Sequence, residues 1–349
     1  MLLSDICEII MGQSPSSDSY NVKGQGLPFF QGNADFGKLY PSVRLWCNCP
    51  IKKAEAGDLL VSVRAPIGAV NLANQKCCIG RGLAALRPYR DKCDAMYLYY
   101  LIKAGKNKLN WLGTGSTFKA ITRSSLLSFN VPDYCIAFQR KISSKLWSVD
   151  KLIHQRNEQL KLFDLLIQSR FLEMFGDIEL NSQNMQKMMW QEVFDTQTGK
   201  LDANAAVKGG RYPFFTCAKE ISTIDEYAYD CEALLLAGNN AVGDYDVKYY
   251  KGKFNAYQRT YILMLKNRQY SYSVFKFQLE QKLRYLQLQS KGTNTRYLTM
   301  GILKSLDFIV PPIVKQQEFA QFVNATDKSK YREAIFLYLL EDIRICCNI

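Results

Sequence analysis

Residues 113–122 read GTGSTFKAIT, and residues 290–299 read SKGTNTRYLT. Both stretches combine glycine and hydroxyl side chains with a later cation, Lys119 in the first and Arg296 in the second. Each leads into an apolar segment that ends in Val-Pro, at 131–132 and at 310–311. A pattern that occurs twice in the same order indicates an internal duplication. Such a duplication constrains the overall fold more than the secondary-structure propensity of any single segment does.

Four further segments recur in the same order along the chain. They pair residues 3–12 with 190–199, 27–30 with 212–215, 56–70 with 230–244, and 130–139 with 309–317. Each pair keeps its apolar positions while the connecting segments differ in length. We therefore predict two copies of one globular unit, with the aromatic pairs Phe29-Phe30 and Phe214-Phe215 in the strand core.

A helical periodicity separates the two copies. Its seam alternates steps of four and three, without Gly or Pro, at Ile142, Leu146, Val149, Ile153, Arg156, Leu160, Phe163, Ile167, Arg170 and Met174. Such a heptad pattern predicts a long helix with a partner helix against it. About 39 helical residues would span roughly 58 Å, which favours a spacer over an ordinary core helix.

A second helical segment follows the second Val-Pro. It offers Phe319, Phe322 and Val323, then the polar stretch NATDKSKYRE, then AIFLYLLEDIR. We expect this tail to lack the regular apolar seam of the first helix. The predicted fold class is α+β: two similar β-rich mixed α/β domains, separated by long helices that form an antiparallel coiled coil. The expected boundaries are 1–135, 136–176, 177–312 and 313–349.

The charge of the chain points to nucleic acid. Lys and Arg number 45 against 32 Asp and Glu, a net charge of +13, and such an excess favours an anionic polymer as partner. An anionic membrane surface is the rival, but no basic amphipathic helix supports it. The longest late apolar run, AIFLYLL, is too short to span a bilayer.

The cysteines and the single histidine, His154, offer little for metal chemistry. Eleven cysteines are irregularly spaced and no C-x-x-C occurs, so structural zinc has almost no ligand set. We expect most cysteines to be small, reduced core residues. The N-terminus carries Asp5 and Glu8 where a signal peptide would be basic and apolar. The predicted location is cytoplasmic.

The stretch at 113–122 matches neither common phosphate-binding fingerprint. Phe118 stands where a P-loop and a dinucleotide-binding loop would each need glycine. What remains is a loop rich in backbone N–H and hydroxyl donors with one cation, which suits the phosphates of a nucleic acid. The alternative, an ordinary capped turn between strands, stays open. The phosphate-binding candidates are Ser116, Thr117, Lys119, Thr293, Asn294 and Arg296.

Candidate base-reading side chains lie near each loop in the repeat. They are Gln31, Asn33, Arg64 and Arg81 in the first unit, and Asn239, Asn240, Gln258 and Arg259 in the second. Arg suits guanine, and Asn or Gln suits adenine, through paired hydrogen bonds in the major groove. Each residue taken singly is also compatible with an ordinary surface position. Because the two units differ here, they would read different sequences.

The first-unit motifs LPFFQGNADFG, GDLLVSVRAPIGAVNLA, GRGLAALRP and GSTFKAIT, with a Val-Pro before a Gln-led helix, resemble the specificity subunit of type I restriction-modification systems. The resemblance implies two DNA target-recognition domains, each followed by a spacer helix, and no catalysis and no cofactor. It also implies as partners double-stranded DNA with a split target, two DNA methyltransferase subunits and restriction subunits. The helices would set the unread gap and dock the methyltransferase subunits.

Two departures from the family pattern leave an alternative open. The chain begins almost on the first motif, and its last helix is shorter than expected. A truncated or silent specificity-subunit allele, acting as a coiled-coil scaffold or half-subunit, is therefore the second hypothesis. A scaffold without DNA recognition fits the basic charge poorly. An enzyme with its own active site has one histidine, no nucleophile motif and no phosphate loop to carry chemistry.

Overall fold

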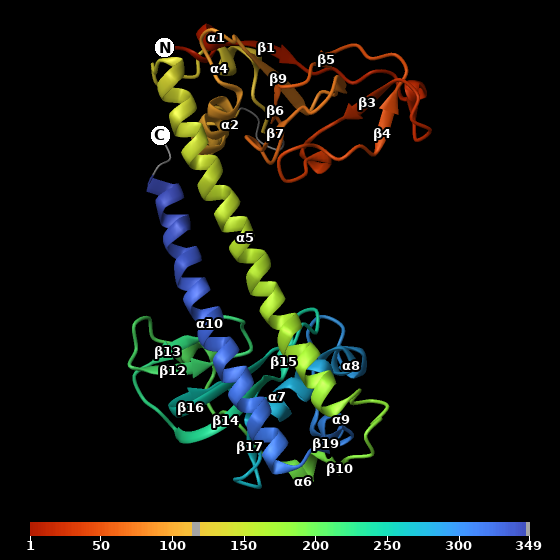
Figure 1. Ribbon diagram of the computed structural model, residues 1–349, viewed down its shortest axis with the longest axis vertical. Coiled ribbons are helices and arrows are strands. Elements are labelled where there is room, and N and C mark those ends of the chain that lie inside the picture. Colours follow the sequence, from red (N-terminus) through yellow and green to blue (C-terminus); the bar gives the residue numbers. More distant parts are fainter. Residues whose placement is uncertain (114–118, 347–349) are drawn as a thin grey trace. The chain divides into compact units, whose positions relative to one another are not determined.

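The computed structural model describes residues 1–113 and 119–346 (Figure 1). It divides into two compact units, Met1–Asn157 with Ile335–Ile349, and Glu158–Ala334. The division passes through both long helices, between Asn157 and Glu158 and between Ala334 and Ile335. Each unit is described in turn.

The first unit contains two sheets. The first has the order β1 (Cys7–Met11), β9 (Leu83–Pro88), β6 (Leu59–Ser62), β7 (Val70–Leu72), all antiparallel. The second has the order β2 (Tyr20–Asn21), β4 (Leu45–Cys47), β3 (Leu27–Phe30), β8 (Cys77–Ile79), β5 (Lys53–Ala54). Strands β3 and β8 run parallel, with Phe30 opposite Ile79. The short 3-10 turns η1 (Ser17–Ser19) and η2 (Asn33–Asp35) lie between strands.

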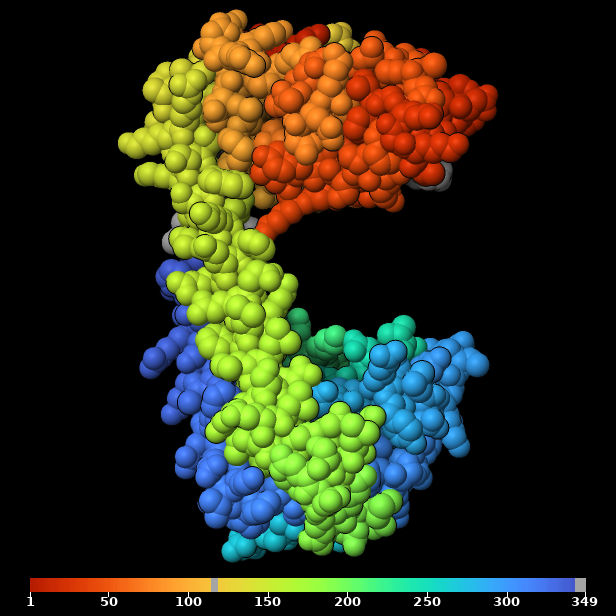
Figure 2. Space-filling view, turned by 45° about the vertical axis from the view of Figure 1, so that its right-hand side comes forward, coloured from red at the N-terminus to blue at the C-terminus, as the bar shows by residue number. Residues whose placement is uncertain are grey.

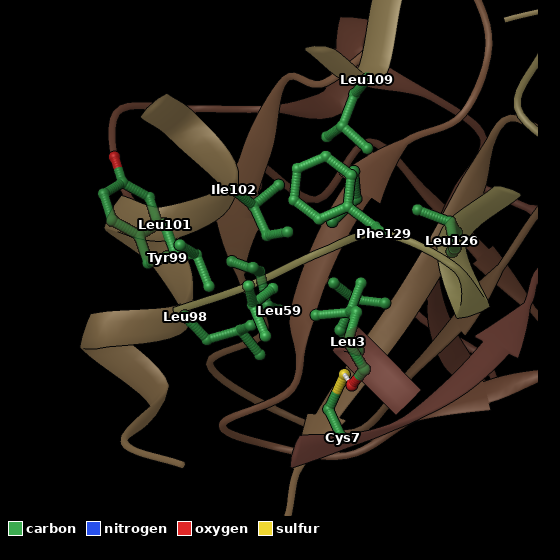
Figure 3. Packing of buried hydrophobic residues seen from close by; sticks show 14 of the residues in the cluster. Leu3, Cys7, Leu59, Leu98, Tyr99, Leu101, Ile102, Leu109, Leu126 and Phe129 are labelled. Carbon is green, nitrogen blue, oxygen red and sulfur yellow. Dashed lines mark hydrogen bonds between the residues drawn. The ribbon is translucent and has the colours of Figure 1, made fainter. Parts of the chain in front are cut away.

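Besides its parts of the two long helices, the first unit contains the short helices α1 (Leu3–Ile6), α2 (Ala95–Ala104), α3 (Lys106–Leu112) and α4 (Arg123–Leu127). Their apolar faces pack on the β1-β9-β6-β7 sheet. Leu109 of α3 lies in this core with Ile102 and Phe129 (Figure 3). Asp94 caps α2 by accepting a hydrogen bond from the Tyr97 N–H at 2.9 Å, as the N-cap position favours.

The second unit repeats this plan in one larger sheet. Its order is β11 (Phe194–Thr198), β17 (Thr260–Leu265), β14 (Tyr229–Ala237), β16 (Val247–Ala256), β12 (Tyr212–Phe215), β13 (Ser222–Ile224). The helices are α6 (Trp190–Val193), α7 (Tyr272–Gln281), α8 (Leu283–Gln289) and α9 (Met300–Lys304), with the 3-10 turn η3 (Ala203–Ala205). Two short pairs join β10 (Gln186–Met189) to β19 (Asp307–Val310) and β15 (Asn239–Asn240) to β18 (Arg296–Tyr297).

The predicted duplication is confirmed, and one parallel strand pair recurs in both units. Strand β12 pairs parallel with β16, with Phe215 opposite Ala256, just as β3 pairs parallel with β8. Both aromatic pairs are buried. Gly68 and Gly243 have positive φ, +80° and +75°, so each supplies a turn after its strand that a residue with a Cβ rarely makes.

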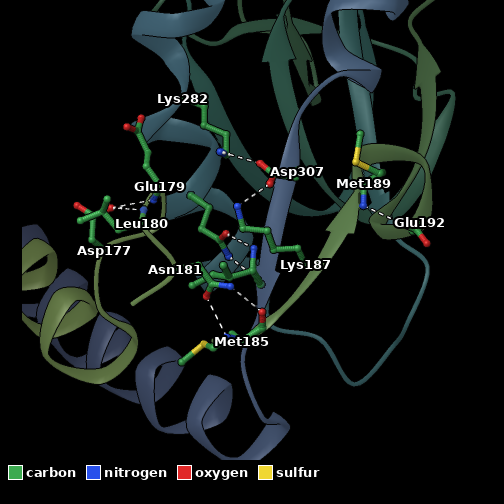
Figure 4. Close-up of polar contacts among 12 residues, drawn as sticks. Asp177, Glu179, Leu180, Asn181, Met185, Lys187, Met189, Glu192, Lys282 and Asp307 are labelled. Atoms are coloured by element: carbon green, nitrogen blue, oxygen red, sulfur yellow. Dashed lines mark hydrogen bonds and ion pairs between the residues drawn. The ribbon is translucent and has the colours of Figure 1, made fainter. Parts of the chain in front are cut away.

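An ion-pair cluster ties β10 and β19 to Lys282, the residue between α7 and α8. The Asp307 carboxylate accepts from the Lys187 ammonium at 2.9 Å and from the Lys282 ammonium at 3.5 Å (Figure 4). Burial alone would raise the pKa of Asp307, but the hydrogen bond from Lys187 and the charges of both lysines outweigh it and lower that pKa.

Each long helix is anchored to the unit before it by one buried glutamine. In α5 (Ile136–Phe175), Gln139 donates to the backbone oxygens of Lys92 and Tyr134 and accepts from the Asp94 N–H at 3.0 Å. In α10 (Ile313–Cys346), Gln316 donates to the Pro311 oxygen and accepts from the Ser271 N–H at 2.9 Å. The Gln-led helix is therefore part of the repeated unit.

The ten positions of the predicted seam lie on one side of α5. All ten seam positions are buried or half-buried, while most positions between them are exposed. In the second unit Asp164 pairs with Lys330 at 2.6 Å, and the Arg170 guanidinium lies 5.9 Å from the Phe322 ring centre. Because the partner number falls as the α5 number rises, the helices are antiparallel. Figure 2 shows the yellow-green side chains of α5 against the blue ones of α10.

Helix α10 carries a seam of its own, although that seam is not regularly apolar. Half-buried and buried positions in α10 continue in steps of four and three at Phe319, Val323, Thr326, Lys330, Glu333, Leu337 and Leu340. Three of these are polar, so an apolar pattern does not reveal them. Lys330 is accommodated because Asp164 faces it, and the Thr326 hydroxyl donates to the Phe322 oxygen within its own helix at 2.9 Å. No helix in the described part of the chain is long and apolar enough to cross a membrane.

Candidate nucleic-acid interface

Three segments of the first unit meet beyond one end of β6. The Val63 N–H donates to the Gly82 oxygen at 3.0 Å, and the Ile121 N–H donates to the Val63 oxygen at 2.8 Å. A β-bridge joins Arg64 to Ala120. This junction therefore brings the end of the 113–122 stretch beside two segments that carry base-reading candidates.

The second unit builds the same junction from different residues. The Gly238 N–H donates to the Arg259 oxygen at 2.8 Å, and the Leu298 N–H donates to the Gly238 oxygen at 2.8 Å. Strands β15 and β18 extend the contact and place Asn240 opposite Arg296. Ile121 and Leu298 thus occupy the same place in the hydrogen-bond pattern of the two units.

All four base-reading candidates of the first unit line one surface hollow. Gln31, Asn33, Arg64 and Arg81 share it with Ser14 and Tyr20. Arg81 is held there by its backbone N–H, which donates to the Ser14 hydroxyl at 3.2 Å. Gln31, Arg64 and Arg81 are exposed and Asn33 is half-buried. The hollow therefore combines two guanidinium and two carboxamide groups, the side chains that discriminate bases by paired hydrogen bonds.

A buried carboxylate that sequence analysis missed positions this hollow. The Asp35 carboxylate accepts from the Gln31 N–H at 2.7 Å and from the Gly32 N–H at 3.4 Å. Its other oxygen pairs with the Arg44 guanidinium. Asp35 is buried and Arg44 is largely exposed. The backbone that carries Gln31 is therefore fixed from behind, and the only sequence signal was the acidic residue within QGNADFG.

The candidates of the second unit are less alike in their surroundings. Gln258 and Arg259 are exposed in the turn between β16 and β17, and Asn239 is half-buried. The Asn240 carboxamide oxygen accepts from the Val242 N–H at 2.9 Å and the Asp244 N–H at 3.1 Å. Asn240 therefore shapes its own turn and keeps only its NH₂ group for another partner.

The phosphate-binding candidates fall into three groups. Lys119, Thr293 and Asn294 are exposed, while Ser116 and Thr117 lie outside the described residues. Arg296 is half-buried, and its guanidinium donates to the Gln287 oxygen at 3.2 Å. Because a guanidinium has five N–H donors, this bond leaves others for a ligand. Among the residues described, no group of three or more His, Cys, Asp and Glu could hold a metal ion.

Comparison with known proteins agrees with this geometry. The family model of the type I restriction modification DNA specificity domain matches residues 1–162 and 182–334. The chain belongs to this family. The two matched stretches contain the two junctions described above.

Individual relatives support the same assignment. The putative type I restriction enzyme MjaX specificity subunit of Methanocaldococcus jannaschii is 44% identical over 152 residues, which cover 44% of this chain and 36% of that protein. The EcoDI specificity subunit of Escherichia coli is 38% identical over 132 residues, covering 37% and 28%. The matched stretches thus span about a third of the length of these curated relatives.

A solved structure shows that the fold extends over the whole chain. The crystal structure of the type I restriction-modification S subunit from M. genitalium superposes with a TM-score of 0.69 and covers 100% of this chain and 94% of that one. The sequence identity is 15%, so this likeness concerns the fold alone.

Proposed function

We propose that this subunit reads a split target on double-stranded DNA, with one half read by each unit. The observation that carries the proposal is the repeated junction, in which the same hydrogen bonds present different polar side chains. Arg64 and Arg81 stand in the first unit, and Asn239 and Gln258 in the second. A shared frame with different donors and acceptors suits two different half-targets.

The subunit acts without catalysis of its own, within a cytoplasmic complex of two methyltransferase subunits and restriction subunits. We propose that the methyltransferase subunits dock on the long helices. Three leucines on α5 support this, because Leu162, Leu165 and Leu166 are 61%, 55% and 46% exposed. A row of exposed leucines on a helix outside its own seam is typical of a protein-binding surface.

The direct test is to map methylated DNA motifs in a host that carries this gene with its methyltransferase partner. We expect a split motif that disappears when the gene is deleted. Exchanging residues 1–135 for the first unit of another family member should change one half of the motif. A change in both halves would contradict independent reading, and the absence of any split motif would contradict the proposed function.

The cations of the two junctions provide a second test. Lys119→Ala should weaken binding to all DNA sequences alike and reduce the salt dependence of binding by about one ion, as loss of a phosphate contact does. Arg296→Lys is the informative change in the second unit because it keeps the charge, so the salt dependence should persist. Binding isotherms at several salt concentrations measure both. A changed base preference in the Lys119 variant would refute its assignment to phosphate.

A further inference from the structure

Helix α3 exposes nearly all of its residues, including a tryptophan. In the sequence KNKLNWL only Leu109 is buried. The exposed residues are Lys106, Asn107, Lys108, Asn110, Trp111 and Leu112, and none is acidic. Trp111 is 88% exposed, so its indole ring is left largely uncovered by the described residues. Apolar surface that stays in water contributes nothing to the folding stability of the free protein, so a large exposed ring suggests a partner.

Helix α8 carries the same arrangement in the second unit. Its sequence is LRYLQLQ, again without an acidic residue, and Leu286 is its one fully buried residue. Leu288 stands two residues after this anchor, as Trp111 stands two residues after Leu109. Leu288 is 72% exposed. An exposed large apolar side chain therefore recurs at one position of the repeat, although single exposed leucines elsewhere need no explanation.

Both helices border the junction of their own unit. In the first unit, a Cβ placed on Gly68 would come within 3.0 Å of the Lys106 side chain, so α3 packs closely on the turn that follows Arg64. In the second unit, the Gln287 side chain donates to the Val242 oxygen at 3.1 Å, and the Gln287 backbone oxygen accepts from Arg296. Leu288 therefore follows directly after Gln287, which is hydrogen-bonded both to Val242 and to Arg296 at the junction.

We propose that Trp111 and Leu288 are apolar DNA contacts, each packing against bases at the edge of the half-target that its unit reads. This inference rests on the proposed function. An aromatic ring stacks on any base, and aliphatic side chains can wedge between base steps or cover a thymine methyl group. The rival partner is a methyltransferase subunit. DNA is favoured because Lys106 and Lys108 flank Trp111, with no carboxylate on the helix.

The experiment uses the full chain in complex with its methyltransferase partner and measures its affinity for target DNA by fluorescence anisotropy. Trp111→Ala should weaken binding about tenfold or more, as loss of a stacked base does. Trp111→Phe, which keeps an aromatic face, should recover most of the affinity. The salt dependence should stay unchanged, since no phosphate contact is removed. Tyr89→Ala is the matched control, because Tyr89 is 40% exposed and follows the end of β9 remote from Arg81.

Leu288 is tested in the same assay against Leu180→Ala, a control for an equally exposed leucine at 79%. Leu288→Ala should weaken binding by several-fold and Leu180→Ala should not. Assembly of each variant with the methyltransferase subunits is measured without DNA. Unchanged DNA affinity for Trp111→Ala, or loss of assembly before DNA is added, would overturn this inference alone. Failure of the unaltered complex to discriminate its target would instead overturn the proposed function.

Discussion

Removing the Asp58 carboxylate should destabilise the first unit without altering what it reads. Asp58 precedes β6, and its side chain is 3% exposed. It accepts from the Arg87 Nε at 3.0 Å, from the Arg87 Nη2 at 2.8 Å and from the Glu55 N–H at 2.8 Å. Arg87 lies on β9, the neighbour of β6 in the sheet. Asp58→Ala would therefore leave the Glu55 N–H without its acceptor, and the Arg87 guanidinium with the Glu8 carboxylate, at 3.5 Å, as its remaining ion-pair partner.

The size of the effect follows from the burial of the two partners. Breaking a fully buried ion pair by removing one member lowers the free energy of unfolding by about 3–5 kcal/mol. The Arg87 side chain is 36% exposed, so water would solvate part of the freed guanidinium. We expect a loss of about 2–3 kcal/mol, which corresponds to a fall of about 1 M in the urea midpoint of the first unit.

Urea unfolding followed by circular dichroism measures this loss. Lys76→Ala is the control, because it breaks the neighbouring Lys76–Glu55 pair, whose side chains are 50% and 46% exposed; the midpoint should hardly move. The methylated motif should stay the same in both variants, since Arg64 follows the opposite end of β6. Equal midpoints for Asp58→Ala and Lys76→Ala would refute the reasoning, and so would a changed motif in a folded Asp58→Ala protein.

Three further predictions concern the ion-pair cluster, the thiols and the spacer. Because the pKa of Asp307 is lowered in the folded state, its carboxylate stabilises the second unit above the ordinary pKa of aspartate, and this contribution is lost as the pH falls through the folded pKa. Asp307→Asn should therefore lower the urea midpoint at pH 7, and its difference from the unaltered protein should shrink as the pH falls below the ordinary pKa of aspartate; a difference that does not depend on pH would contradict this. Burial raises the pKa of Cys7, Cys77 and Cys93 to about 12, so a thiol reagent at pH 8 should modify the exposed Cys49 and Cys135 first; peptide mass mapping that finds the buried three modified in folded protein would contradict it. One heptad inserted after Arg156 adds about 10 Å of helix and keeps the seam aligned, so the methylated motif should gain up to about three base pairs of gap with both half-targets unchanged. Two inserted residues should abolish assembly with the methyltransferase, and an unchanged gap in the heptad variant would show that α5 is not the spacer.

The duplication and the seam of α5 were predictable from the amino-acid sequence alone. Both depend on where apolar residues stand, and burial of those residues is the main favourable free energy of folding. Phe29-Phe30 and Phe214-Phe215 are buried for this reason. The expectation that most cysteines lie in the core holds for Cys7, Cys47, Cys77, Cys78 and Cys93, whereas Cys49 and Cys135 are exposed.

The composition of the candidate interface was predictable only in part. Glycine, hydroxyl and cationic residues indicated both loops. The cation at equivalent positions, Lys119 and Arg296, indicated that the two loops correspond to each other. The sequence did not reveal that Gln31, Asn33, Arg64 and Arg81 line one hollow, since they come from three separate segments. It also did not reveal the role of Asp35, because the sequence alone does not distinguish a buried aspartate from a solvent-exposed one.

Tertiary structure alone decided which polar groups became structural. Lys330 occupies a seam position of α10 because Asp164 faces it from α5, and Asp58 is buried because Arg87 reaches it from the next strand. A charged group leaves water only where a partner from another element offsets its lost hydration. Apolar residues need no such particular partner, so their pattern along the chain determined the two units and the long helix, while the polar positions were settled only by the neighbours that folding brought to them.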